Sequence, residues 1–295
     1  MKRGDLGLLV VAVVAVSVSG PLIREADAPA LSIAAWRNVL AVGVLVAVVL
    51  ATPAHRSAVR AVSAGDRRMT GLAGVLLAGH FATWVPSLAL TTVASSVALV
   101  CTQPIWTALL ARLRGDPVSR NAWWGIALSL AGVVVLSGVD LSVSGRALAG
   151  DALALAGGML AAGYVTAGAH VRTSVPNPVY TLGCYAVAAL VLLLLAGGTG
   201  QALTGYTGRT WLVLVALAAG PQLLGHSVFN RLLPTVGTLV VSVSVLLEVL
   251  GAALLAWWWQ SETPPAAAIP AAMLLVGGVF LVVRAQEVTR PIEPP

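Results

Sequence analysis

The sequence predicts an all-α integral membrane protein with ten transmembrane helices, arranged as two inverted five-helix repeats. Of the 295 residues, 58% are hydrophobic and only 9% are charged, whereas a soluble domain carries about 25% charged residues. The apolar residues come in long runs, as helices that cross a bilayer require. These runs are too long to be the alternating strands of a membrane barrel.

Each predicted span is an apolar run of about 20 residues, which is the length that crosses about 30 Å of hydrocarbon. Proline, glycine or charged residues separate most of the runs, but no charge separates the third from the fourth near Leu90. The predicted spans are 6–24, 30–51, 70–89, 92–112, 120–139, 150–170, 178–197, 210–229, 235–258 and 266–284.

Lysine and arginine alternate sharply between the two sides of these spans. One side holds Lys2, Arg3, Arg56, Arg60, Arg67, Arg68, Arg112, Arg114, Arg120, Arg172, Arg231, Arg284 and Arg290. The other side holds only Arg24, Arg146 and Arg209. Positive loops stay in the cytoplasm, so both termini are expected there. The basic loops would lie along the inner membrane surface, where anionic lipid attracts them. The net charge of +6 therefore indicates no nucleic-acid partner.

The N-terminus and the two cysteines have simple interpretations. Lys2 and Arg3 precede an apolar run, as in a secretory signal peptide. The run continues through Pro21 into Arg24, and we therefore interpret it as the first span. Cys101 and Cys184 both fall inside spans; they have no metal-ligand spacing and define no disulfide framework. We expect no metal site and no cofactor.

Short sequence matches relate the two halves of the chain. Pro29 corresponds to Pro178, His80 in a Gly-His pair corresponds to His226, and Gln103 corresponds to Glu248, at offsets of 149, 146 and 145. Repeats with an odd number of spans insert in opposite senses, and inverted repeats are common in secondary transporters. We therefore expect repeats at 1–139 and 140–290, followed by a cytoplasmic tail at 291–295.

The order of these motifs resembles the EamA-type permeases of the drug/metabolite transporter superfamily, over nearly the whole chain. The motifs are Arg37, the segment 80–88 (HFATWVPSL), the segment 93–96 (VASS) before Gln103-Pro104, Gly225-His226 with Asn230, Pro234-Thr235, and Glu248. Val249 stands where the family usually has a second proline. Glu262 fits an acidic position after the ninth span, and Asp116 lies near the matching place in the first half. The resemblance implies a bacterial inner-membrane transporter of small metabolites, commonly an exporter.

Two charged residues lie at membrane depth, where charges are rare and usually functional. Arg37 and Glu248 are both expected roughly 10–12 Å below the outer side, from a rise of 1.5 Å per residue. Their opposite signs favour an ion pair or a shared substrate zone. Two alternatives are open: Arg37 could snorkel to the outer headgroups, and a protonated Glu248 could serve helix packing.

Gln103 and Glu248 each lie on a stripe of small or polar residues. Gln103 shares a face with Ser96, Val100 and Thr107, and Glu248 shares one with Gly237, Val241, Ser244 and Gly251. Pro104 cannot donate to the carbonyl of Val100, which leaves that carbonyl open to a side chain, water or substrate. The alternative is close helix packing, which also favours small residues.

Further polar and aromatic residues inside the spans complete the candidate site. His80 and His226 could relay protons, or could be neutral and bonded to a backbone or hydroxyl partner. The interior aromatic residues Trp84, Trp106 and Tyr164 could line a substrate site together with Asn230. We predict substrate binding by Gln103, Glu248, His80, Trp84, Trp106, Asn230, Ser244 and Tyr164. Arg37, Glu248 and His226 are predicted to act in coupling or in an ion pair.

The prediction is therefore a secondary carrier that works by alternating access on amino acids, other small metabolites or drug-like compounds, with protons as a candidate coupling ion. We expect no catalytic residues, because no motif of a membrane enzyme is present. A membrane scaffold or sensor is the other alternative, but the longest loop, the basic stretch after Pro53, has only 17 or so residues. A monomer or weak dimer surrounded by lipid is expected.

Overall fold

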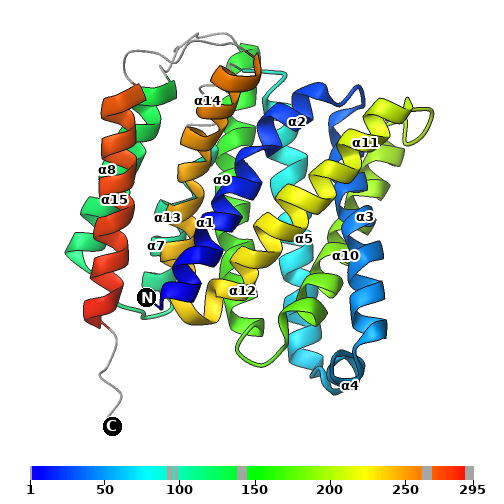
Figure 1. Ribbon diagram of the computed structural model, residues 1–295, viewed down its shortest axis with the longest axis horizontal. Coiled ribbons are helices and arrows are strands. Elements are labelled where there is room, and N and C mark those ends of the chain that lie inside the picture. The colour runs from blue at the N-terminus through cyan, green and yellow to red at the C-terminus, as the bar shows by residue number, and fades with distance from the viewer. Residues whose placement is uncertain (1, 92–95, 97–98, 138–144, 261–267, 290–295) are drawn as a thin grey trace.

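The computed structural model describes residues 2–91, 96, 99–137, 145–260 and 268–289, and every regular element in these ranges is a helix (Figure 1). Glu262 lies outside the described residues. The first half contains α1 (Arg3–Ser17), α2 (Ser19–Glu25), α3 (Ala30–Ala51), α4 (Pro53–Ala61), α5 (Ala64–Ser87), α7 (Gln103–Leu113) and α8 (Arg120–Ser137). The second half contains α9 (Gly145–Val171), α10 (Asn177–Gly198), α11 (Gly208–Leu217), the π-helix η1 (Ala218–His226), α12 (Ser227–Val236), α13 (Thr238–Val245), α14 (Leu247–Gln260) and α15 (Ala268–Thr289).

Six stretches of the described chain are long and apolar enough to cross a membrane. They are Arg3–Glu25, Ala30–Ala51, Ala64–Ser87, Gly145–Val171, Asn177–Gly198 and Gly208–Val236. Each coincides with a predicted span. The other four predicted spans overlap α7, α8, the pair α13 and α14, and α15, which are not among these six stretches. The all-helical architecture is confirmed, and the count of ten crossings stays a prediction.

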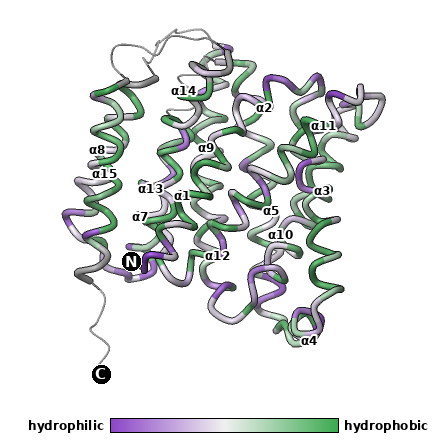
Figure 2. The backbone as a smooth tube through the Cα atoms, viewed as in Figure 1, coloured by the Kyte–Doolittle hydropathy of each residue, from purple (hydrophilic) through white to green (hydrophobic). Residues whose placement is uncertain are grey.

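The helices run roughly parallel to one axis, so the bundle has two ends. In Figure 1, α1 begins and α15 ends at the lower end, where α4 also lies, and α2 ends at the upper end near the start of α11. Hydrophobic residues cover most of the helix length between the two ends (Figure 2). The basic stretch after Pro53 was expected to be a loop, but it forms α4, which has Pro53 in its first turn and exposes Arg56 and Arg60. Proline is favoured there, because the first turn does not use its missing N–H.

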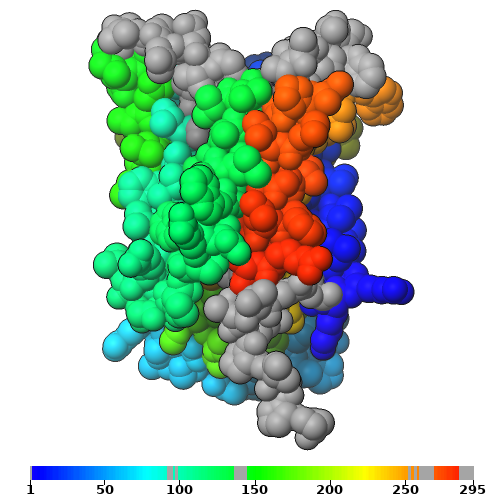
Figure 3. Space-filling model, turned by 90° about the vertical axis from the view of Figure 1, so that its left-hand side faces the viewer, coloured from blue at the N-terminus to red at the C-terminus, as the bar shows by residue number. Residues whose placement is uncertain are grey.

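Corresponding helices of the two halves pack against each other. The second helices, α3 and α10, are neighbours, and so are the fifth, α8 and α15; Figure 3 shows α8 and α15 side by side on one face. A Cβ on Gly125 would lie 2.7 Å from the carbonyl oxygen of Gly278, and a Cβ on Gly278 would lie 2.5 Å from that of Gly125. The absence of side chains at both positions lets the two backbones touch, as is common between membrane helices.

Candidate functional site

Two helices of the bundle are interrupted at corresponding points. A turn at Cys101 and Thr102 precedes α7, and a turn at Leu246 separates α13 from α14. The N–H groups of Thr102 and Leu246 donate to the carbonyls three residues before them, Leu99 at 3.1 Å and Val243 at 3.1 Å. The two bonds are 144 residues apart. Both halves therefore contain a discontinuous helix, a feature of transporter binding sites.

The second interruption forms without a proline. In the first half Pro104 is the second residue of α7, after Gln103. In the second half Val249 keeps its N–H, which donates to the carbonyl of Leu246 at 3.2 Å. The carbonyl of Val100, expected to be open beside Pro104, is instead covered by α9, because a Cβ on Gly158 would lie 2.8 Å from that oxygen. The carbonyl of Val100 is therefore closed off by packing against α9 and is not open to substrate.

Gln103, the first residue of α7, binds the second repeat directly. Its side-chain amide donates to the hydroxyl of Ser242 at 3.1 Å, and that hydroxyl lies 3.0 Å from the hydroxyl of Thr107. Ser242 was not among the predicted residues. The predicted Ser244 has a buried hydroxyl without a hydrogen-bond partner in the described part of the chain. The indole N–H of Trp106 donates to Thr102 in the preceding turn at 3.1 Å.

Arg37 is 1% exposed and points into the bundle, so it does not snorkel to the headgroups. Its Nε donates to the Oε1 of Gln222 at 2.9 Å, and its Nη1 lies 3.5 Å from the hydroxyl of Ser19. The amide of Gln222 in turn donates to the Oδ1 of Asn38 at 3.1 Å. The ring of Phe81 covers the guanidinium, with 4.6 Å between its centroid and Cζ, a distance typical of cation–π contacts. Arg37 therefore connects α2, α3 and α5 of the first half to η1 of the second.

Gln222 owes its position to the π-helix η1. Pro221 lies inside this element, and π-helical turns often occur at functional sites. The hydroxyls of Tyr185 and Ser227 lie 3.4 Å and 3.2 Å from the carbonyl of Gln222, and both donate to it. Gln222 was not among the predicted site residues. Its pairing with Arg37 joins residues 185 positions apart, which periodicity within one helix cannot predict.

Both predicted histidines contact Phe81, and the ring centroids of His80 and Phe81 are 5.0 Å apart. His80 stacks on Trp84 with 5.7 Å between ring centroids, and its Nδ1 lies 3.0 Å from the carbonyl oxygen of Gly157. His226 meets Phe81 edge to face at 6.0 Å. The backbone partner of His80 agrees with the alternative of a neutral, hydrogen-bonded histidine. The indole N–H of Trp84 is buried without a partner among the described residues.

Electrostatic interactions connect the charged and titratable residues of the two halves. Arg37 interacts with Glu248, with His80 and with His226, and Glu248 interacts with Cys101 in the turn before α7. Arg37, His80 and His226, from α3, α5 and η1, all contact the ring of Phe81, and Glu248 of α14 is linked to them by its electrostatic interaction with Arg37. We call these four residues the charged cluster.

Tyr164 and Asn230 form a second group within the second half. The side-chain amide of Asn230 donates to the hydroxyl of Tyr164 at 2.6 Å. Tyr164 interacts with Tyr185, which in turn interacts with Arg37. Tyr185 thus connects these two predicted residues to Arg37, and it was not itself among the predicted site residues.

Comparison with known proteins places this arrangement in a family. The model of the EamA-like transporter family matches residues 3–138 and again residues 148–284. The chain belongs to the EamA-like transporter family. It is therefore a multi-pass membrane transporter of the drug/metabolite transporter superfamily, and the two matches correspond to its two repeats.

A solved structure supports the same fold for this EamA-like permease. A chain described only as "Crystal structure of protein" matches with a TM-score of 0.80 and 20% sequence identity, over 98% of the permease and 100% of the other chain. At this identity the likeness shows the fold alone. No curated protein sequence matches the chain.

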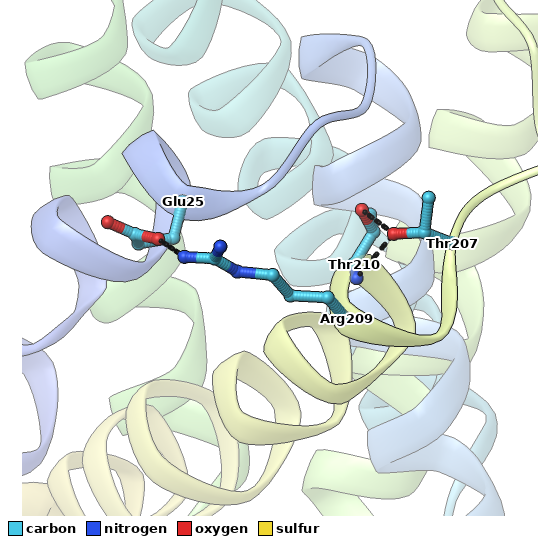
Figure 4. Close-up of polar contacts among 4 residues, drawn as sticks. All are labelled: Glu25, Thr207, Arg209 and Thr210. Carbon is cyan, nitrogen blue, oxygen red and sulfur yellow. Dashed lines mark hydrogen bonds and ion pairs between the residues drawn. The ribbon is translucent and has the colours of Figure 1, made fainter.

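At the upper end, the two repeats of the permease meet in a polar and aromatic contact. Arg209 at the start of α11 forms an ion pair with Glu25 at the end of α2, with 2.5 Å between nitrogen and oxygen (Figure 4). Thr207 caps α11 by accepting from the N–H of Thr210 at 3.2 Å. Trp36 donates to the carbonyl of Leu203 at 2.7 Å and packs edge to face on Trp211. We call the contacts Glu25–Arg209, Trp36–Leu203 and Trp36–Trp211 the upper contact.

Proposed function

We propose that the permease is a secondary transporter that exports small metabolites, including amino acids or drug-like compounds, by alternating access. The observation that carries this proposal is the charged cluster, in which each repeat contributes one charged residue and one histidine beside an interrupted helix. Charges at membrane depth usually mark a substrate or ion pathway. Relative movement of the repeats would change the distance between Arg37 and Glu248. Their electrostatic interaction would therefore change during the transport cycle.

The upper contact supports a gate at one end of this pathway. It joins α2 and α3 of one repeat to α11 and the preceding loop of the other. An exposed ion pair contributes only about 0–1 kcal/mol, so it can open and close at little cost. We propose that the upper end faces the outside and that both termini are cytoplasmic in the bacterial inner membrane, because the exposed arginines of α4 lie at the lower end.

Export driven by the proton gradient would require a group that exchanges protons with one side at a time. Glu248 is half-buried and interacts with Arg37, and we propose it for this role. Facilitated diffusion would need no such group.

The deciding experiment is metabolite efflux from liposomes that contain the purified permease, with and without a pH gradient. We expect faster efflux of specific metabolites than from protein-free liposomes, and a dependence on the gradient that Glu248→Gln abolishes. Efflux that stays at the protein-free rate for every metabolite would contradict transport and favour a scaffold or sensor. A Glu248→Gln variant that still follows the gradient would exclude the coupling role alone.

A further inference from the structure

A proline inside α12 leaves one backbone carbonyl of that helix without its regular partner. Pro234 lies within α12, and a proline has no N–H to donate to the carbonyl four residues before it, which here belongs to Asn230. Asn230 is 2% exposed, and a buried acceptor without a donor is unfavourable. This carbonyl therefore needs a donor from another part of the bundle.

Arg172 is that donor. Its Nε donates to the carbonyl oxygen of Asn230 at 3.1 Å, and its Nη1 donates to the carbonyl of Val175. Arg172 directly follows α9, and Val175 lies in the turn that leads to α10. Prolines are tolerated in membrane helices because neighbouring groups satisfy the carbonyls that they free. Arg172 thus connects the turn between α9 and α10 to the carbonyl that Pro234 frees.

A second hydrogen bond connects the same turn to α12. The side-chain amide of Asn177, the first residue of α10, donates to the carbonyl of Ser227 at 2.9 Å. Ser227 begins α12, and the regular helical donor to its carbonyl is the N–H of Arg231. The carbonyl of Asn230 lacks a regular helical donor, so it depends more strongly on Arg172 than Ser227 does on Asn177.

Asn230 carries this dependence to a pair of predicted substrate-binding residues. Its side-chain amide donates to the hydroxyl of Tyr164 at 2.6 Å, and Tyr164 is 4% exposed. The carbonyl that Arg172 holds and the amide that reaches Tyr164 belong to one residue. A displacement of the carbonyl therefore also moves the amide relative to Tyr164.

We propose that Arg172 is a positioning residue for substrate binding. By donating to the carbonyl of Asn230, it holds α12 at Pro234 and keeps the pair of Asn230 and Tyr164 in place. This inference rests on the proposed transport function. It gives Arg172 a role beyond the positive charge that it contributes to the lower end of the bundle.

The first variant, Arg172→Met, removes the guanidinium donors and keeps an unbranched side chain. Liposomes are loaded with increasing concentrations of the metabolite that the wild-type permease exports fastest from a bacterial extract, and efflux is followed by mass spectrometry. We expect the concentration for half-maximal efflux to rise at least about fivefold, while the maximal rate changes less than about twofold, because a displaced pair weakens binding.

Pro234→Ala is the background that tests the cause. It returns an N–H to position 234, and this N–H can donate to the carbonyl of Asn230 as in a regular helix. Adding Arg172→Met to Pro234→Ala should therefore change the half-maximal concentration less than about twofold. Arg231→Met removes the exposed arginine next to Asn230 and should leave the half-maximal concentration unchanged.

Unfolding in sodium dodecyl sulfate separates positioning from a purely structural role. If Arg172→Met lowers the unfolding midpoint but not the apparent affinity, the positioning role is overturned. An equal rise in the half-maximal concentration with and without Pro234 would overturn it too, and so would an equal rise in Arg231→Met. If Arg172→Met does not fold, the double variant must fold and retain the half-maximal concentration of Pro234→Ala, or the proposal fails.

Failure of the proposed function has a different signature. If no metabolite leaves wild-type liposomes faster than protein-free liposomes, transport is contradicted, and the positioning role is contradicted with it. The hydrogen bond to Asn230 is then still tested by the unfolding midpoints. A loss in Arg172→Met that disappears in the Pro234→Ala background would support that bond, and a loss of equal size in both backgrounds would contradict it.

Discussion

The side-chain amide nitrogen of Gln103 lies 3.1 Å from the hydroxyl oxygen of Ser242, so the two repeats are hydrogen-bonded to each other directly beside the interruption that precedes α7. Thr107, one turn further along α7, shares the same hydroxyl at 3.0 Å. One serine of α13 therefore serves two side chains of the other repeat. This contact fixes the position of the broken helix of the first repeat against that of the second.

Removal of this serine hydroxyl should destabilise the permease measurably. Ser242→Ala leaves the amide of Gln103 and the hydroxyl of Thr107 without their shared partner, and side-chain hydrogen bonds between membrane helices contribute about 0.6 kcal/mol each on average. We expect a loss of about 1 kcal/mol in the free energy of unfolding. The measurement is equilibrium unfolding in mixed micelles containing increasing amounts of sodium dodecyl sulfate.

Ser244→Ala is the matched control for this prediction. Ser244 lies on the same helix and is equally buried, but its hydroxyl has no partner among the described residues. Replacing it should cost nothing or slightly stabilise the protein, because an unpaired buried hydroxyl is removed. Equal losses for Ser242→Ala and Ser244→Ala would show that the cross-repeat bond contributes nothing.

Gln222→Ala should cost more than the loss of a neutral hydrogen bond. The change leaves the Nε of Arg37 without a partner inside the bundle, and hydrogen bonds to charged groups contribute about 1.5–3 kcal/mol. We expect a loss of about 2 kcal/mol in the free energy of unfolding, measured in the same way.

Gln201→Ala provides the comparison for Gln222. Gln201 accepts from the backbone N–H of Leu31 at 3.0 Å, in a partly buried position near the upper contact, so its loss should cost about 1 kcal/mol or less. If Gln222→Ala and Gln201→Ala lowered the free energy of unfolding equally, the hydrogen bond from Gln222 would not be needed to stabilise the buried charge of Arg37.

The sequence predicted the helices better than it predicted their contacts. Long apolar runs with prolines between them locate the spans, because hydrophobic length is a local property. The stripe that joined Ser244 to Glu248 assumed a continuous helix. The turn at Leu246 lies between these two residues, and no proline marks it. The backbone at Leu246 keeps helical torsion angles, so the shared face of Ser244 and Glu248 stays a prediction. The contact that the spacing missed is the one between Ser242 and Gln103.

The contacts between the repeats could not be predicted from the sequence either. The inward position of Arg37 depends on Gln222, Ser19 and Phe81, which come from three other helices. The likeness of the two repeats predicted that corresponding helices exist in both halves. It contained no information on the register at which those helices face one another, and that register determines which polar groups pair.

Cross-linking the upper contact should arrest transport if this end opens during the cycle. In a variant with Glu25→Cys and Arg209→Cys, a short bismaleimide with a reducible disulfide in its spacer would connect α2 to α11. We expect efflux from liposomes to fall to the protein-free rate after cross-linking and to recover after reduction. Each variant with only one of the two introduced cysteines, treated in the same way, should remain active. Full activity of the cross-linked protein would show that the upper contact stays closed throughout transport.

Adding a methyl group at the contact between α8 and α15 should force the two helices apart. In Gly278→Ala the new Cβ would lie 2.5 Å from the carbonyl oxygen of Gly125, a distance that backbone atoms cannot accommodate without moving. Overpacking of this kind typically costs about 1–3 kcal/mol. The neighbouring Gly277→Ala is a stringent control, because its Cβ would meet only the Cδ2 of Leu128 at an ordinary 3.6 Å. Unfolding in sodium dodecyl sulfate should therefore show a clear loss of stability for Gly278→Ala and very little for Gly277→Ala. Equal stabilities of the two variants would show that the two helices are free to separate.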